Sequence, residues 1–210
     1  MGDVRRRQMM GGSTPNYIEI QYLGCTGSQF IDTGIAPMST DKIYYKFGGY
    51  SGPNKTMIGC IAKNSDLAMA IVRTSVTSAN TWEHDLYIRM FGIKATEFTN
   101  PSNVWRVEYT NGQYSLYDNN GPVQRTYDGY QPAVVDSTKY ETLTIFKRNG
   151  LENSLALNAQ CYYLRIVRNE KPILDLIPVR VGQTGYMYDK VTHKLFGNNG
   201  SGTFVLGPDL

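Results

Sequence analysis

The sequence predicts an all-β protein built as an antiparallel β-sandwich, and three observations support this. Its 210 residues include 16 Tyr and 21 Gly, while charged residues make up only 19%; such a composition favours strands and turns over helices. Several segments alternate with a period of two. In 104–110, Trp105, Val107 and Tyr109 fall on one side and polar residues on the other, as in a half-buried strand. Third, no segment keeps a helical period beyond about ten residues.

Short strand-like segments recur along the chain between turn signals. We expect strands at 17–23, 29–35, 42–50, 56–62, 67–73, 85–92, 104–110, 113–118, 123–129, 141–148, 159–169, 171–181, in two short pieces around 186–197, and at 202–207. The dipeptide NG at 111–112 predicts a hairpin, and NNG at 119–121 and RNEK at 168–171 are further candidates. Many short strands at steady spacing predict a sandwich or jelly roll.

In the C-terminal segments, the sequence indicates which residues share a face of a strand. Alternation in 173–179 places Ile173, Asp175 and Ile177 on one face, opposite Leu174 and Leu176. In 185–210, Asp189 and Thr192 are natural turn residues between two strands whose aromatic residues, Tyr188 and Phe196, we expect to pack together. The Gly-Asn run at 197–202 suits a tight turn with positive φ, so this end of the chain is predicted to be a meander.

Residues 1–16 are predicted to form an extended basic arm, and 17–210 the folded domain. Three arginines against Asp3 give the first ten residues a charge of +2, out of +3 for the whole chain. The arm ends in Gly-Gly-Ser-Thr-Pro, which breaks periodic structure. It is either a disordered linker or an assembly anchor that orders on a partner, with the arginines meeting carboxylates and the methionines filling an apolar slot. The anchor residues are Arg5, Arg6, Arg7, Met9 and Met10.

Composition excludes several classes of partner and compartment. The three cysteines, Cys25, Cys60 and Cys161, are odd in number and far apart, which argues against a disulfide framework or a zinc site. No signal peptide and no run of transmembrane length is visible in the sequence. The small net charge does not demand nucleic acid. We therefore expect a protein made in the cytosol, without nucleic-acid or membrane partners.

Candidate catalytic groups are sparse. Glu83 and Asp85 lie two residues apart, as in the carboxylate row of sandwich glycosidases, but no third acid follows them. His84 and His193 have no partner at metal-ligand spacing. We predict no catalytic residue and no resident metal. Calcium binding stays open, because Asp118, Asn119 and Asn120, or Asp128, could supply oxygen ligands; an ordinary β-turn is the favoured interpretation of these residues.

Ligand binding is expected at aromatic residues in connections. Flat aromatic faces suit the apolar face of a sugar ring, with Asp or Asn nearby to accept hydrogen bonds from its hydroxyls. The candidates are Trp82, Tyr127, Tyr130 and Asp128. The alternative is that these aromatic side chains cap the ends of the sandwich, since large aromatic residues are mostly buried.

Both ends of the domain resemble a known family. The segments at 17–35 and 162–207, with Gln29 to Gly34, Leu174 to Pro178, Gly185 to Phe196 and Gly200 to Phe204 as the matching motifs, are similar to the LamG-like, concanavalin A-like jelly-roll domains of gut-bacterial (Bacteroides-type) phages and prophages. The head VRRRQMM (4–10) is similar to the N-terminal arm of phage virion proteins. The motif residues themselves suit core and turn roles.

The resemblance implies a non-enzymatic virion protein, either a head fibre, a decoration protein or a tail-associated protein. It would be assembled in the host bacterial cytoplasm, anchored to other virion proteins by its arm, homo-oligomeric, and turned outward toward host surface glycans. A bacterial surface carbohydrate-binding module or adhesin is the alternative, and a glycan-cleaving enzyme is a third, less favoured hypothesis. Fold alone does not decide among these roles.

Overall fold

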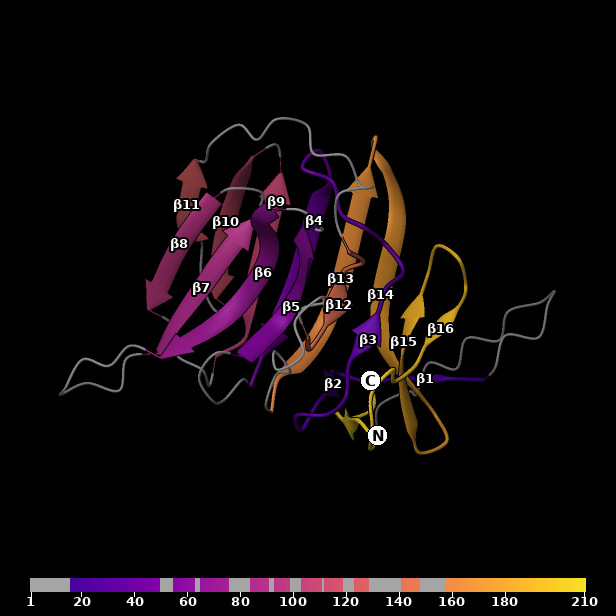
Figure 1. Ribbon diagram of the computed structural model, residues 1–210. Coiled ribbons are helices and arrows are strands. Elements are labelled where there is room, and N and C mark those ends of the chain that lie inside the picture. Colours follow the sequence, from indigo (N-terminus) through magenta and orange to yellow (C-terminus); the bar gives the residue numbers. More distant parts are fainter. Residues whose placement is uncertain are drawn as a thin grey trace.

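The computed structural model describes residues 16–49, 55–62, 65–75, 84–90, 93–98, 103–110, 112–118, 123–128, 141–147 and 158–210. These residues form two antiparallel β-sheets and contain no helix (Figure 1). The described part of the chain accordingly offers no helical segment that could cross a membrane.

The larger sheet carries eight strands in one path. In order they are β11 (Val123–Asp128), β10 (Gln113–Asp118), β9 (Trp105–Thr110), β4 (Lys42–Gly48), β13 (Gln160–Arg168), β14 (Lys171–Val181), β15 (Thr184–Asp189) and β16 (Leu195–Phe196). Three short strands join this path from the side. β1 (Ile18–Glu19) pairs with β14, while β2 (Leu23–Gly24) pairs with both β13 and β17 (Val205–Leu206).

The smaller sheet has the order β3 (Ile31–Asp32), β12 (Thr144–Ile145), β5 (Lys55–Ala62), β6 (Ser65–Ser75), β7 (His84–Met90) and β8 (Ile93–Phe98). From β2 to β5 the chain changes sheet at each step, and β3 and β4 pair with β12 and β13, which are also consecutive in sequence. This wrapping of consecutive strand pairs across two sheets is a jelly roll. The predicted antiparallel jelly-roll sandwich is confirmed.

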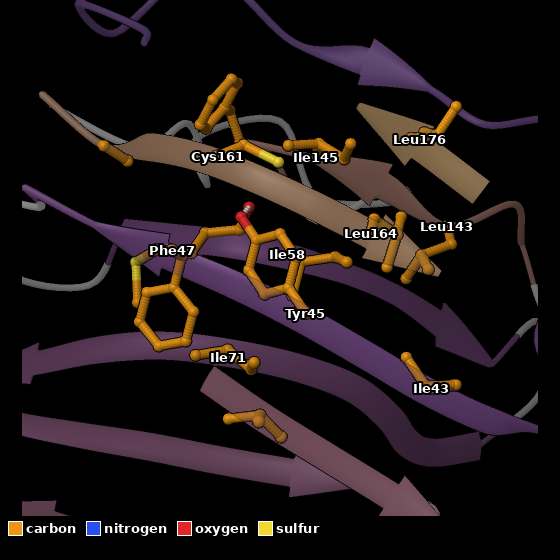
Figure 2. Close-up of a cluster of buried hydrophobic side chains, with 14 of the residues drawn as sticks. Ile43, Tyr45, Phe47, Ile58, Ile71, Leu143, Ile145, Cys161, Leu164 and Leu176 are labelled. Atoms are coloured by element: carbon orange, nitrogen blue, oxygen red, sulfur yellow. Dashed lines mark hydrogen bonds between the residues drawn. The ribbon is translucent and has the colours of Figure 1, made fainter. Parts of the chain in front are cut away.

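One core fills the space between the sheets (Figure 2). Ile43, Tyr45 and Phe47 of β4 face Ile58 and Ile71 of the smaller sheet, and all five are fully buried. The Tyr45 hydroxyl donates to the backbone oxygen of Met57 at 3.1 Å. This buried hydrogen bond joins the two sheets directly, so the polar tip of a core tyrosine is satisfied.

Two predicted hairpins are confirmed. β13 and β14 pair from Arg168 opposite Lys171, and Asn169 and Glu170 between them both have positive φ, at 50° and 60°. Two positive φ values match the twist that a two-residue hairpin needs. β9 and β10 are joined through the NG dipeptide, where Gly112 has φ of 77°. β10 and β11 also pair antiparallel, with the NNG sequence in the connection, outside the described residues.

The structure corrects four expectations. β8 was not predicted, because its sequence IKATEF lacks clean apolar alternation. The expected strand at 17–23 is divided between β1 and β2, which have different partners. β17 pairs with β2 instead of continuing a meander. Tyr188 is opposite Leu195, whereas Phe196 is opposite Met187, so Tyr188 and Phe196 belong to opposite faces of their hairpin.

The terminal motifs have structural roles, as expected. The buried Gln29 amide accepts from the Thr26 backbone N–H at 2.8 Å and donates to the Thr203 backbone oxygen at 3.0 Å. Asn199 accepts from the Asp32 backbone N–H at 2.9 Å. Gly200 is packed so closely that an added Cβ would collide with the Ser28 backbone oxygen. The first and last motifs of the domain therefore hold each other.

The three cysteines are buried free thiols. Burial raises the pKa of Cys25 to about 11 and that of Cys60 to about 12, and it also raises the pKa of Cys161. A raised pKa keeps the thiol protonated, and a protonated buried thiol is unreactive. This supports the expectation of three inert cysteines in the core.

Candidate functional site

The candidate site lies on the outward face of the larger sheet, away from the core. In β9, Trp105, Val107 and Tyr109 are buried while Arg106 and Glu108 are partly exposed, as the alternation in the sequence predicted. Along β4 and β14, buried residues alternate with partly exposed residues in the same way. This face therefore collects side chains from strands that are far apart in the sequence.

A first row of side chains crosses four strands. Tyr117 of β10 is directly opposite Arg106 of β9, Arg106 is opposite Lys46 of β4, and Lys46 is opposite Tyr163 of β13. Side chains of directly opposite residues are close enough to interact. The row therefore has two cations in the middle and a tyrosine at each end.

A second row runs parallel to the first, one step further along the strands. Glu108 of β9 is opposite Tyr44 of β4, Tyr44 is opposite Arg165 of β13, and Arg165 is opposite Asp175 of β14. The backbone of Lys190 extends this row, because its N–H donates to the Asp175 backbone oxygen at 2.9 Å. Aromatic, cationic and acidic groups thus lie next to one another on a partly exposed surface.

A β-bulge in β13 places two consecutive tyrosines on this face. The register with β4 shifts between Cys161 and Tyr163, so Tyr162 is the extra residue. Cys161 and Leu164 are buried, whereas both Tyr162 and Tyr163 are partly exposed. Bulges commonly redirect side chains next to functional sites. Without the bulge only one of the two tyrosines could face outward.

The outward face contains two adjoining hollows. The larger, which we name the tyrosine hollow, has a volume of about 420 Å³. The smaller, which we name the cationic hollow, has a volume of about 260 Å³. Tyr163 lines both of them. The tyrosine hollow is lined by Tyr44, Tyr162, Tyr163, Arg165, Asp175, Ile177 and Lys190. The cationic hollow is lined by Lys46, Val104, Trp105, Arg106, Tyr117, Asp118 and Tyr163.

Tyr162, which lines the tyrosine hollow, is held in place by neighbours outside that hollow. Its hydroxyl donates to the side-chain oxygen of Gln160 at 2.9 Å, and its ring lies 5.7 Å from the ring of Tyr22. The Lys46 ammonium lies 5.4 Å from the centre of the same ring, within the range of a cation–π contact. An aromatic wall fixed before binding loses little freedom when a ligand arrives.

Arg106 is fixed in the cationic hollow in a similar way. Its guanidinium stacks over the Tyr117 ring at 4.1 Å, and its Nε is 3.1 Å from Glu108 Oε1. The Tyr117 hydroxyl donates to Glu108 Oε2 at 3.2 Å. Glu108 therefore positions both the arginine and the tyrosine.

The hydroxyls of the two bulge tyrosines are neutral donors. Burial raises the pKa of Tyr162 above its ordinary value, and the neighbouring Tyr22 adds to the effect. Burial also raises the pKa of Tyr163, although the charge of Arg106 and a hydrogen bond from it act in the opposite direction. Both hydroxyls consequently keep their protons at neutral pH, and each can donate or accept a hydrogen bond.

The residues predicted from the sequence are not those that form the hollows. Tyr127 and Asp128 end β11, at the edge of the same sheet, where they are opposite Tyr114 and Gln113. Trp82, Tyr130 and the anchor residues Arg5, Arg6, Arg7, Met9 and Met10 lie outside the described residues. Their proposed roles remain predictions.

Sequence reasoning missed the tyrosines of the strands. Tyr44 and Tyr163 stand at outward positions of alternating strands, where a polar side chain is the ordinary choice. An aromatic residue at such a position was a usable signal. The placement of Tyr162 was not visible in the same way, because the bulge depends on pairing with β4.

The described surface offers few side chains that are suited to metal binding or catalysis. No group of three His, Cys, Asp or Glu among the described residues could hold a metal ion. Asp118 lines the cationic hollow, but Asn119 and Asn120 lie outside the described residues, so the calcium alternative is untested. Glu83 also lies outside them. The arrangement that the structure does show is one of donors, acceptors and aromatic faces, which is suited to binding.

No protein-family model matches the chain, and no curated protein sequence matches it. Solved structures that are similar to it include the following two. The CBM40 module of the Ruminococcus gnavus IT-sialidase, bound to α2,3-sialyllactose, is 15% identical, with 69% of this chain and 89% of that chain covered and a TM-score of 0.43. The native heptameric SAP-like pentraxin from Limulus polyphemus is 12% identical, with 82% and 80% covered and a TM-score of 0.45. Neither similarity carries a ligand or an activity over to this chain.

Proposed function

We propose that this protein is a non-enzymatic glycan-binding module and that the tyrosine hollow holds a sugar ring. The observation that carries the proposal is the set of three tyrosines placed around Arg165 and Asp175 in one solvent-open hollow. A sugar has an apolar C–H face and a rim of hydroxyls, and it therefore needs an aromatic surface next to hydrogen-bond donors and acceptors.

The polar groups of the tyrosine hollow can supply the hydrogen-bond donors and acceptors that a sugar requires. Arg165 is exposed, and no described residue forms an ion pair or side-chain hydrogen bond with its guanidinium. Asp175 is its direct cross-strand neighbour, so a planar donor fork and a carboxylate acceptor lie side by side. Adjacent sugar hydroxyls can donate to the carboxylate and accept from the guanidinium. A hollow of this volume lies within the range of small-ligand sites.

The finer role that we propose is that of a phage virion protein, a head fibre, decoration or tail-associated component. It is supported by the resemblance of the terminal motifs and by the Arg- and Met-rich head of the sequence. In this role the arm contacts other virion proteins, the protein forms a homo-oligomer, and the jelly roll meets glycans on the host surface. Mass spectrometry of purified particles tests this role: absence of the protein from them would contradict it.

Glycan-array binding with paired variants tests the binding function. Tyr163→Ala and Arg165→Ala should each reduce binding by about 5-fold to 150-fold, because each removes a contact worth about 1–3 kcal/mol. Tyr186→Ala is the matched control, since Tyr186 is a partly exposed tyrosine of the same sheet that lines neither hollow. Thermal melting of every variant establishes that it is folded. Folded hollow variants that bind as well as the control would overturn the proposal.

A further inference from the structure

The cationic hollow contains two like charges in direct apposition. Lys46 and Arg106 are cross-strand partners on the outward face, and like charges in this relation destabilise a sheet. No described carboxylate lies within ion-pair distance of Lys46, and its described contact is the Tyr162 ring at 5.4 Å. Glu108 offsets the charge of Arg106, whereas Lys46 has no carboxylate partner among the described residues.

Arg106 keeps donors available in the same hollow. Its Nε side faces Glu108 at 3.1 Å, and the flat guanidinium is stacked on Tyr117. An arginine has five N–H donors in a fixed fork, so Glu108 and the Tyr163 hydroxyl do not use them all. The Arg106 side chain is 41% exposed. A ligand group entering the hollow can therefore meet both the guanidinium and the Lys46 ammonium.

We propose that the cationic hollow binds an anionic substituent, a carboxylate or a sulfate ester, of the glycan whose ring occupies the tyrosine hollow. This inference rests on the proposed function and names the ligand class of the same face. An anion between Lys46 and Arg106 offsets their repulsion and accepts charge-assisted hydrogen bonds from both. Tyr163 lines both hollows, so one ligand can reach from its ring site to its anion site across that side chain.

The local carboxylates limit where the anion sits. Glu108 is occupied by Arg106 and Tyr117, while Asp118 is the one acidic side chain that lines the cationic hollow. Asp118 belongs to β10 beyond Tyr117, at the end of the row away from Tyr163. The anion is therefore expected beside Lys46 and Arg106, on the side of the hollow that Tyr163 lines and away from Asp118.

Matched pairs of oligosaccharides test the inference. The probes are oligogalacturonides and the same oligomers after reduction of their carboxyl groups to alcohols, together with sulfated galactan oligomers before and after desulfation. The acidic member of at least one pair should bind at least about tenfold more tightly, as expected for charged hydrogen bonds, and added salt should narrow the difference. Calorimetry or biolayer interferometry measures each affinity.

Two lysine variants distinguish a specific anion site from a general effect of positive charge on binding. Lys46→Met keeps the aliphatic stem and should abolish the preference for the acidic member while leaving neutral binding in place. Lys42→Met is the control, because Lys42 is an outward lysine of the same strand that pairs with the exposed Glu170 instead of lining a hollow. Equal binding of acidic and neutral members, or a preference that survives Lys46→Met, overturns the inference alone. Failure of every probe to bind counts against the proposed function as well.

Discussion

Asp189 is a fully buried carboxylate that organises one wall of the tyrosine hollow. Its Oδ1 accepts from the backbone N–H groups of Asp175 and Val191 at 2.9 and 3.1 Å. Its Oδ2 accepts from the Thr192 backbone N–H at 3.2 Å and from the Thr192 hydroxyl at 2.6 Å. Four donors in place of water make the burial of this charge tolerable. The expected turn role of Asp189 and Thr192 is thus realised, and it also fixes Asp175 and Lys190 beside the site.

Replacing Asp189 by Ala should lower the free energy of unfolding by about 3 kcal/mol, because three partly buried backbone donors and a hydroxyl lose their acceptor. Chemical denaturation followed by tryptophan fluorescence measures the change. Thr203→Ala serves as control, since Thr203 is exposed and its described hydrogen bond uses only the backbone oxygen. If the two variants were equally stable, the turn would not depend on this carboxylate.

At the scale of elements, the bulge in β13 turns an ordinary strand into part of a site. On either side of Tyr162 the burial pattern is regular, with Cys161 and Leu164 inward and Tyr163 outward. The extra residue is therefore an insertion into an otherwise intact alternation. It adds the ring that contacts Lys46 and Tyr22.

Deletion of Tyr162 should therefore be tolerated by the fold. Cys161 would still face the core and Tyr163 would still stand opposite Lys46, so we expect a melting temperature within a few degrees of the parent and weaker glycan binding. Deletion of Leu164 is the contrasting variant, because it turns every later residue of β13 to the opposite face and should abolish cooperative unfolding. Circular dichroism during heating compares the two. Similar melting curves for both deletions would show that register in β13 is not set as described.

Local elements could be predicted from the sequence, whereas contacts between distant segments could not. The faces of β9 and β14 and the turn at Asn169 and Glu170 depend on neighbouring residues, and these predictions are confirmed. The pairing of β17 with β2 depends on segments at opposite ends of the domain. The site belongs to the second kind. Its first row joins residues from β10, β9, β4 and β13, and no local pattern indicates that these four residues meet.

At the scale of the whole molecule, residues 19–20 and 209–210, from the two ends of the domain, lie side by side. The Leu210 N–H donates to the Glu19 backbone oxygen at 3.0 Å, and the Arg180 guanidinium binds Asp209 through two hydrogen bonds of 2.7 and 2.6 Å. The Tyr17 ring packs on Tyr188 at 4.6 Å. These contacts among residues 17–210 close the sandwich where its first and last segments meet.

Deletion of residues 2–12 should accordingly separate folding and binding from assembly. The contacts that close the sandwich are made among residues 17–210, so the melting temperature and the affinity for glycans should match those of the full chain within error. If Arg5, Arg6, Arg7, Met9 and Met10 anchor the protein, the truncated form should be missing from particles, as measured by quantitative mass spectrometry of purified virions. Replacement of the three arginines by glutamine, with both methionines kept, tests whether charge contributes, since it removes the pairing with partner carboxylates. A truncated protein that enters particles at the normal level would contradict the anchor role while leaving the glycan-binding proposal intact.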